Sequence, residues 1–287
     1  MAVAGCLFIF NFKIIIYTLV FFIIWTFFII IGKPEIIKLQ NQWQKNYSLS
    51  QDYIYEISAV NIIVGSSMAT RMDNDFLPNN YYNLSFGGGG VLTGLEIIKR
   101  SKKTPSNIYL EVNNIFKEKD SDLIARLFYP VLWKIKKYVP SLKAKYQPIN
   151  IFLSYLKSTF GKSHEEHINE QKNDKIYEMN IIKHIINYEK IVLDCDKELS
   201  ELKKLVQYFE EKDTKIIFFE MPIDEKLIKT KKVTLQREII NTHFVNDWIP
   251  LPNNRKYVTS DGIHLLYKSA YLYSKIFISE AEKLYDI

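Results

Sequence analysis

An uncharged stretch near the N-terminus constrains this chain more than any other feature. Residues 14–32 contain no Asp, Glu, Lys or Arg. A helix rises about 1.5 Å per residue, so a stretch of this length reaches across most of the roughly 30 Å hydrocarbon core of a bilayer. Residues 7–12 extend the apolar stretch beyond Lys13, whose long side chain can reach the interface. We therefore predict an N-terminal transmembrane anchor within residues 1–34.

The alternative to an uncleaved span is a cleaved signal peptide. The apolar region of a signal peptide usually has about 7–15 residues, and a small-x-small cleavage site follows it. Here the apolar region is longer, and no such site follows Ile31. Residues 3–6 look like the end of a lipoprotein signal, but no apolar region precedes them. We therefore interpret Cys6 as an ordinary residue and the span as uncleaved.

The composition predicts a folded domain behind this helix. Hydrophobic residues make up 47% of the 287 residues and charged residues 24%, which excludes a disordered chain, a collagen-like fibre and a small disulfide scaffold. Cys6 and Cys195 are far apart in the sequence, and we expect no structural disulfide. The net charge of +6 arises from lysines interspersed with nearly as many acids, so we expect no binding of nucleic acid.

After the span, strand-like and helix-like patterns alternate. Residues 35–57 are polar with scattered apolar side chains and predict a juxtamembrane stalk. Patterns of buried strands occur at residues 60–64, 81–86, 107–112 and 215–220, and helical patterns at residues 91–102, 196–213 and 264–285. Such alternation predicts an α/β domain, residues 58–287, with a parallel sheet covered on both faces. Residues 116–190 break the alternation, and we interpret them as a helical insertion over the carboxyl edge of the sheet.

A pair of serines directly follows the first predicted strand. Gly65, Ser66 and Ser67 stand where that strand turns into the next element. Ligands of open α/β sheets bind at the carboxyl ends of the strands, so a serine here can present its hydroxyl and its backbone N–H to a substrate carbonyl. The simpler interpretation is a helix N-cap, and the serines alone do not decide between the two.

Two further segments end predicted strands with groups that can donate to an anion. Asn83 is followed by the four glycines 87–90, whose backbone N–H groups can approach a ligand closely. The alternative is a flexible turn, and the spacing fits neither a P-loop nor a dinucleotide fingerprint. Asn113 follows the third strand, and its amide can donate to a developing oxyanion, although an asparagine at a strand end usually belongs to a turn.

An acid and a histidine three residues apart precede the last predicted helix. Asp261 and His264 flank Gly262 on a turn, from which both side chains can point the same way. Asp261 would then orient His264 as the general base for a serine. His164 and His167 look like a metal-binding pair, but they lie in a hydrophilic run with no third ligand. A solvated helix face is the favoured interpretation of that pair, and we expect neither a metal nor a cofactor.

These segments, in this order, resemble the SGNH (GDSL-like) hydrolase superfamily over about residues 58–287. Ser67 matches the serine of the family's first block. Gly88 matches the oxyanion-hole glycine of the second block, with Gly87 as the alternative. Asn113 matches the asparagine of the third block. The resemblance implies a three-layer, flavodoxin-like α/β fold with helices on both faces of a parallel sheet.

The most specific match is the last block, Asp-x-x-His, which is Asp261 and His264 here. The chain departs from the family pattern elsewhere. Ser66 stands in place of an aspartate, Glu111 in place of a glycine and Asn114 in place of an aspartate. Such substitutions are familiar in the membrane-anchored branch, which resembles cell-envelope acyl transferases and esterases, including those acting on teichoic acids and exopolysaccharides.

The resemblance implies acyl transfer at a serine. Ser67 would attack an ester carbonyl, His264 would accept its proton, and Asp261 would hold the imidazole. The N–H groups of Ser67 and Gly88 and the amide of Asn113 would receive the oxyanion. Water or a sugar hydroxyl would then resolve the acyl-enzyme. The implied substrate is an acylated glycan or a small ester, and a transferase would take its acyl group from a membrane-bound donor protein.

Two other classes of protein stay open. An α/β-hydrolase also places Ser, Asp and His in this chain order, but its Gly-x-Ser-x-Gly turn needs a glycine where Ala69 stands. Its acid and histidine also usually come from separate loops. The other class is a catalytically inert, membrane-tethered partner of an envelope assembly complex, which the departures from the family pattern leave open.

The charges around the span and the implied function disagree about its orientation. Lys13 precedes the span, whereas Lys33, Lys38 and Lys45 follow it. The positive-inside rule alone would leave the large domain in the cytoplasm. A long domain behind a lone N-terminal anchor often translocates regardless of a few charges, and the resemblance is to envelope enzymes. We therefore expect the catalytic domain outside the cytoplasm.

Overall fold

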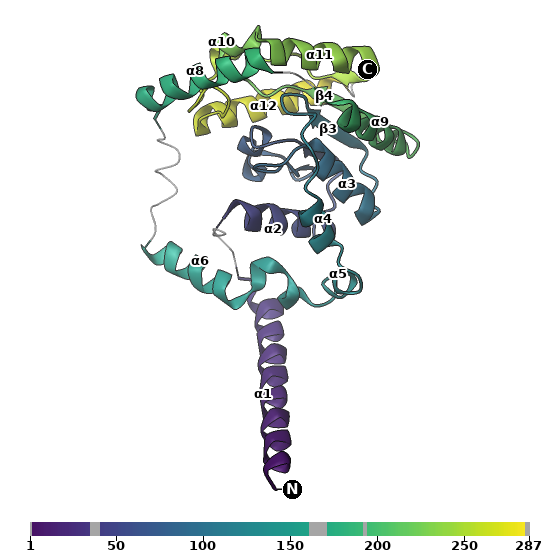
Figure 1. The fold of residues 1–287 in the computed structure, drawn as a ribbon, viewed down its shortest axis with the longest axis vertical. Helices are drawn as coiled ribbons and strands as arrows, with labels where there is room; N and C mark the ends of the chain where they lie inside the picture. The colour runs from purple at the N-terminus through teal and green to yellow at the C-terminus, as the bar shows by residue number, and fades with distance from the viewer. Residues whose placement is uncertain (1, 35–40, 161–170, 192–193, 285–287) are drawn as a thin grey trace. The chain divides into compact units, whose positions relative to one another are not determined.

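The structure is a computed structural model, which describes residues 2–34, 41–160, 171–191 and 194–284 (Figure 1). Contacts divide the chain into two compact units. The anchor unit comprises Met1–Gln51 and Leu127–Lys162, and the sheet unit comprises Asp52–Arg126 and Ser163–Ile287.

The sheet unit contains a parallel sheet of five strands in the order β2-β1-β3-β4-β5. The strands are β1 (Asn61–Val64), β2 (Tyr81–Asn83), β3 (Asn107–Glu111), β4 (Lys215–Phe219) and β5 (Asp247–Trp248). Ile62 of β1 lies between Tyr82 of β2 and Ile108 of β3. This is the strand order of flavodoxin-like folds, and it confirms the predicted α/β fold with a parallel sheet.

Helices cover both faces of this sheet. Successive strand residues point to opposite sides, and the buried residues of β1 and β3 therefore pack against helices on each side. On one face, Tyr109 and Phe219 pack edge-on against Phe277 of α12 (Tyr267–Lys283). On the other face, α3 (Val91–Ser101) contacts β1, and α9 (Asp196–Glu210) contacts α3 and β4. At Gly94 of α3, a Cβ atom would lie 2.3 Å from Cγ1 of Val64. The missing side chain therefore allows α3 to pack closely on β1.

The sheet unit contains further α-helices and 3₁₀ helices (η). They are η1 (Ala69–Arg71), η2 (Asn74–Phe76), α4 (Ser121–Leu127), α8 (Asp174–Lys190), α10 (Glu225–Ile228), α11 (Lys231–His243) and η5 (Asn254–Lys256). Helix α8 contacts α10 and α11, as Figure 1 shows. Tyr177 and Ile181 of α8 belong to the same core as α12, so α8 is a structural part of the sheet unit.

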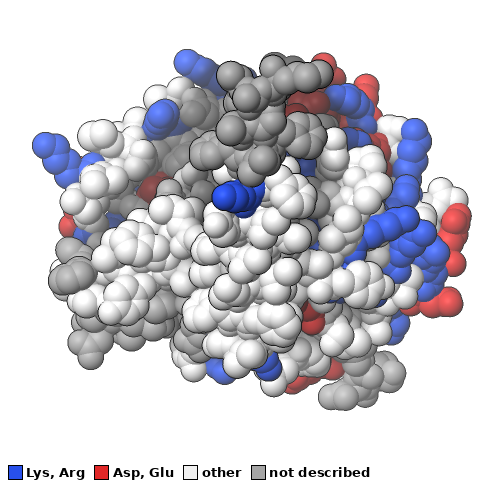
Figure 2. Space-filling view, turned by 90° about the horizontal axis from the view of Figure 1, so that it is seen from below, with Lys and Arg blue, Asp and Glu red and all other residues white. Residues whose placement is uncertain are grey.

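The anchor unit is helical. Its elements are α1 (Ala2–Gly32), α2 (Gln42–Tyr55) as far as Gln51, α5 (Leu132–Ile135), η3 (Pro140–Leu142), η4 (Ala144–Tyr146) and α6 (Pro148–Phe160). Within α1, Phe12–Gly32 is long and apolar enough to cross a membrane, which agrees with the predicted helix. Seen from the N-terminal end of α1, uncharged side chains cover the middle of the exposed face (Figure 2).

Side-chain contacts hold residues 127–160 in the anchor unit. Residues 127–160 pack with the N-terminal helices instead of forming one insertion with α8. The ammonium of Lys136 donates to the Tyr47 hydroxyl at 2.9 Å, and the backbone N–H of Ala144 donates to the Gln51 amide oxygen at 2.8 Å. The predicted insertion 116–190 is thus shared between the two units.

Several element boundaries also differ from the predictions. Strand β2 ends at Asn83, three residues before the predicted end, and α12 begins at Tyr267 instead of residue 264. Strand β5 and helices α10 and α11 were not predicted from the sequence. Of the predicted stalk, residues 35–40 lie outside the described residues, and so do His164 and His167.

Candidate active site

Ser67 lies in the turn that joins β1 to η1, at the carboxyl edge of the sheet. Its Oγ is 3.0 Å from Nε2 of His264, a residue 197 positions later in the chain. The Thr70 hydroxyl donates to the Ser67 carbonyl at 2.7 Å and closes the turn. The structure therefore brings the first and the last of the predicted site segments together.

A tight turn before α12 places the Asp261 carboxylate beside the His264 ring. Oδ1 of Asp261 accepts the backbone N–H groups of Ile263 at 3.1 Å and His264 at 2.8 Å, and Oδ2 lies 2.7 Å from Nδ1 of His264. Gly262 has a φ of +100°, a backbone conformation that residues other than glycine rarely adopt. A bridge between Thr259 and Leu265 closes the turn. The acid thus fixes both the backbone and the ring of the histidine.

These contacts suit the transfer of a proton from Ser67 to His264. Burial raises the pKa of Asp261, but the hydrogen bonds from the ring and backbone of His264 outweigh it and hold the pKa well below its usual value. An ionised Asp261 accepts the hydrogen on Nδ1 of His264. Nε2 is then left to accept the Ser67 hydroxyl proton, which is the arrangement that a general base needs.

Ser66 faces a different partner from Ser67. The carboxylate of Glu111, which is only 1% exposed, lies beneath the serine turn. It accepts the Ser66 N–H at 2.6 Å, the Ser66 hydroxyl at 2.9 Å and the Ala69 N–H at 3.3 Å. Gly65 permits this approach, because a Cβ there would lie 2.5 Å from Oε2 of Glu111. The two neighbouring serines therefore divide between the buried carboxylate and the histidine.

Glu111 explains two departures from the family pattern together. The resemblance places an aspartate where Ser66 stands and a glycine where Glu111 stands. In this chain the carboxylate comes from the end of β3, and a hydroxyl that donates to it comes from the end of β1. Burial raises the pKa of Glu111, and the two hydrogen bonds from Ser66 oppose that rise. The serine turn thus keeps a carboxylate beneath it.

A lysine extends this network away from the serines. The Asn114 amide donates to Oγ of Ser66 at 3.2 Å, and Lys232 of α11 donates to the Asn114 amide oxygen at 2.7 Å. The Lys232 ammonium also lies 4.3 Å from the ring centre of Tyr188 on α8. Burial lowers the pKa of Lys232 to about 8, although the charge of Glu111 opposes this. Lys232 and Tyr188 were not predicted as residues of the site, because no local sequence pattern indicates them.

The predicted oxyanion residues lie near the same edge of the sheet. The Asn113 amide donates to the Met221 carbonyl at 3.1 Å and accepts the Met221 N–H at 2.7 Å, which uses one of its two amide hydrogens. Gly88 has a φ of +71° in the turn where Gly89 N–H donates to the Phe86 carbonyl at 3.0 Å. The roles of Asn113 and Gly88 in an oxyanion hole stay predictions.

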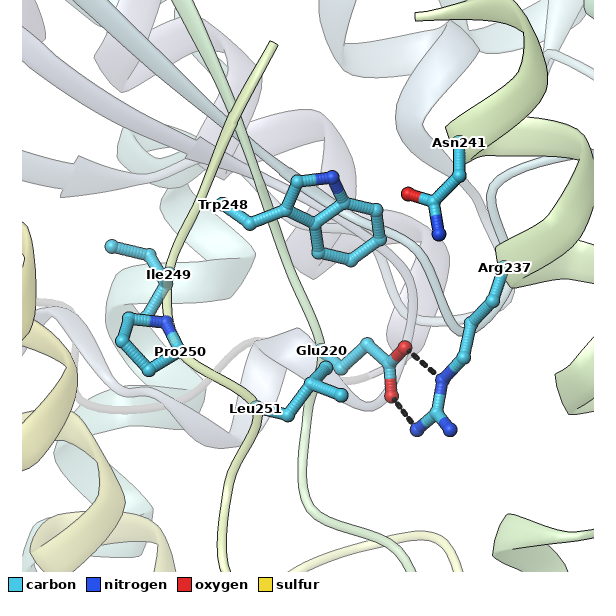
Figure 3. Close-up of a pocket in the computed structure, with 7 residues that line it drawn as sticks. All are labelled: Glu220, Arg237, Asn241, Trp248, Ile249, Pro250 and Leu251. Atoms are coloured by element: carbon cyan, nitrogen blue, oxygen red, sulfur yellow. Dashed lines mark hydrogen bonds and ion pairs between the residues drawn. The ribbon is translucent and has the colours of Figure 1, made fainter. Parts of the chain in front are cut away.

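A hollow lies at the ends of β4 and β5. Its volume is about 230 Å³, and Figure 3 shows its lining residues, Glu220, Arg237, Asn241, Trp248, Ile249, Pro250 and Leu251. Arg237 donates to both oxygens of Glu220, at 2.6 Å each. Neither Ser67 nor His264 lines this hollow. Among the residues that the structure describes, no group of three or more His, Cys, Asp or Glu could hold a metal ion.

Comparison with known proteins adds little to this geometry. No protein-family model matches the chain, and no curated protein matches it. A structural match is a crystal structure from Bacteroides fragilis whose description assigns it provisionally to the acylhydrolases. It is 10% identical, the match covers 85% of this chain and 99% of that one, and the TM-score is 0.41. This similarity is too low to support an argument about function, so the proposal below depends on the site itself.

Proposed function

We propose that this chain is a serine-dependent esterase or O-acyltransferase that forms an acyl-enzyme on Ser67. The observation that carries the proposal is the continuous set of contacts from Ser67 Oγ through the His264 ring to Asp261, at 3.0 and 2.7 Å. A serine is a weak nucleophile until an adjacent base removes its proton. The orientation of His264 by the partly buried Asp261 supplies that base.

The reaction follows from this geometry in two halves. Ser67 Oγ attacks the ester carbonyl while its proton passes to Nε2 of His264, and the positive ring is stabilised by Asp261. His264 then protonates the leaving alcohol. In the second half, water or a sugar hydroxyl gives its proton to His264 and attacks the acyl carbon. The bond between that carbon and Ser67 Oγ then breaks, and His264 returns the proton to Ser67 Oγ. The N–H groups of Ser67 and Gly88 and the Asn113 amide are our proposed oxyanion donors.

The proposed substrate is an acyl ester on a cell-envelope glycan or glycopolymer, and this part rests on the family resemblance. In the same proposal, α1 anchors the chain as a single membrane span with the sheet unit outside the cytoplasm. A transferase would receive its acyl group from a membrane-bound donor protein. A fusion of alkaline phosphatase to the C-terminus tests the orientation: we expect an active phosphatase, and an inactive one beside an active cytoplasmic reporter fusion would contradict it.

An esterase assay on the full-length chain in detergent tests the proposed chemistry. A generic acetyl ester should be hydrolysed by the wild type, and Ser67→Ala should lose several powers of ten in kcat. Thr242→Ala is the matched control, because its exposed hydroxyl contacts only the Glu238 carbonyl in its own helix. Its activity should equal that of the wild type. Equal activity of Ser67→Ala and wild type would instead favour the inert-partner alternative or contamination.

A further inference from the structure

The anchor unit exposes apolar side chains beyond α1. We call residues 127–160 the collar. Its exposed apolar and aromatic residues are Tyr129, Val131, Leu132, Ile135, Tyr138, Ile149, Phe152 and Tyr155. An exposed apolar patch of this kind marks a surface that binds a protein, a membrane or a ligand.

Helix α6 of the collar has its polar and apolar faces reversed. Asn150 and Ser154, one turn apart, are each only 3% exposed, whereas Ile149 is 54% and Phe152 57% exposed. The Asn150 amide donates inward to the Ala144 carbonyl at 2.7 Å. A helix on a water-facing surface buries its apolar face. The reversed pattern of α6 therefore suits an apolar environment on its outer side.

The collar is attached to the last turns of α1. Trp25 Nε1 donates to the Tyr146 carbonyl at 3.0 Å, and the hydroxyls of Thr26 and Ser141 lie 2.7 Å apart. Ile29 is buried at the same level. Thr26 is six residues before Gly32, which is about 9 Å along the helix axis. If α1 spans the bilayer, the collar must lie where the helix passes from hydrocarbon to headgroups.

The charge of the collar suits lipid headgroups. Residues 127–160 contain six lysines and no aspartate or glutamate. Lysine-rich segments beside a membrane anchor are attracted to anionic lipids. Lys134 and Lys137 are exposed and alternate with the exposed Leu132 and Ile135. Exposed apolar residues beside cations are typical of a surface that lies in the membrane interface.

We propose that the collar is an interfacial membrane-binding surface, with Ile149 and Phe152 inserted at the level of the headgroups and the exposed Lys134 and Lys137 on anionic lipid phosphates. The proposal rests on the insertion of α1 in the bilayer and holds for either orientation of the chain. It does not depend on the catalytic chemistry. The occupant of the patch is the lipid bilayer into which α1 runs.

Fluorescence quenching by lipids tests this surface in the full-length chain. Single cysteines replace Ile24 of α1, Phe152 of the collar or Leu272 of α12 in a background with Cys6→Ala and Cys195→Ala, and each carries an NBD label. The proteins are placed in nanodiscs of equal parts phosphatidylcholine and phosphatidylglycerol, with or without a spin label high on the acyl chains. Leu272 is the control in the sheet unit, since it is also an exposed apolar residue.

We expect the labels at Ile24 and Phe152 to lose most of their emission, and the label at Leu272 to keep it. Quenching at Ile24 without quenching at Phe152 would overturn the collar proposal. Absence of quenching at Ile24 would instead show that α1 is outside the bilayer, which overturns both the proposed anchor and the collar. Ile149→Cys provides a second collar position if Phe152→Cys alters the melting temperature of the chain.

Discussion

Glu111→Gln removes the charge beneath the serine turn and leaves the size of the side chain unchanged. In the wild type, the carboxylate accepts three hydrogen bonds, two from Ser66 and one from the Ala69 N–H. A glutamine has one oxygen acceptor and one NH₂ group that cannot accept. At least one donor of the buried turn therefore loses its partner.

The size of the effect follows from these contacts. A buried donor without a partner costs about 1–3 kcal/mol, and a hydrogen bond to a charged group contributes about 1.5–3 kcal/mol. Lys232 also loses a neighbouring negative charge. We expect the free energy of unfolding to fall by about 2–4 kcal/mol. At about 2–4 °C per kcal/mol for a domain of this size, Tm should fall by roughly 4–16 °C.

Thermal unfolding followed by tryptophan fluorescence measures this change, and ester hydrolysis measures its effect on the site. Because Ser66 precedes the candidate nucleophile, Glu111→Gln should lower kcat more than it changes KM. Glu201→Gln is the matched control, since Glu201 pairs with Lys119 near the surface and such pairs contribute about 0–1 kcal/mol. A Tm within the error of the wild type for Glu111→Gln would refute the buried-carboxylate argument.

Three further changes test other parts of the account. Asp261→Asn should lower kcat by roughly 10³–10⁴-fold, because His264 loses the acceptor that fixes its tautomer. The pKa of Asp261 is lower in the folded chain than in the unfolded one, so the ionised side chain stabilises the fold above the unfolded pKa of about 3.9, and this stabilisation is lost below it. The Tm difference between wild type and Asp261→Asn should therefore shrink in acid. Lys232 has a folded pKa of about 8 and an unfolded pKa of about 10.4, so the unfolded chain binds more protons between these values, and the stability of wild type relative to Lys232→Met should rise with pH across that window in urea unfolding. Gly94→Ala places a Cβ 2.3 Å from Val64 and should cost about 1–3 kcal/mol of unfolding free energy by the same method.

The elements that could be predicted from the sequence are those formed by residues close together in the chain. Strands β1, β3 and β4 are continuous apolar runs, and the structure places their ends within one residue of the predictions. Asp261 and His264 could be predicted as a pair because one short turn holds both, and no distant residue is needed for their contact. The parallel sheet follows from the alternation of such runs with helices.

The remaining features depend on contacts between distant residues. Glu111 and Ser66 are 45 positions apart, so the sequence showed each as a separate departure and not as a carboxylate with its donor. Strand β5 has only two residues, Asp247 and Trp248, and forms through its pairing with β4. The collar could not be separated from α8 by sequence, because both are helical and Lys-rich. The contacts with α1 and α2 place the collar in the anchor unit.

The structure also bears on which of the two adjacent serines is the candidate nucleophile. Oγ of Ser67 is 3.0 Å from His264, whereas Oγ of Ser66 donates to Glu111 at 2.9 Å. Ser66→Ala should therefore lower the stability of the chain, because Glu111 loses the hydrogen bond from the Ser66 hydroxyl. The Ser67 hydroxyl beside His264 remains in this variant. The two alanine variants consequently separate a structural role from a nucleophilic one.

Labelling by a fluorophosphonate probe, with the modified peptide identified by mass spectrometry, tests which serine is the nucleophile. Such a probe reacts with a serine that a neighbouring base activates. We expect the adduct on Ser67 in the wild type and in Ser66→Ala, measured below the melting temperature of each, and no adduct in Ser67→Ala. An adduct on Ser66, or ester turnover by a wild type that never reacts with the probe, would contradict the proposed nucleophile.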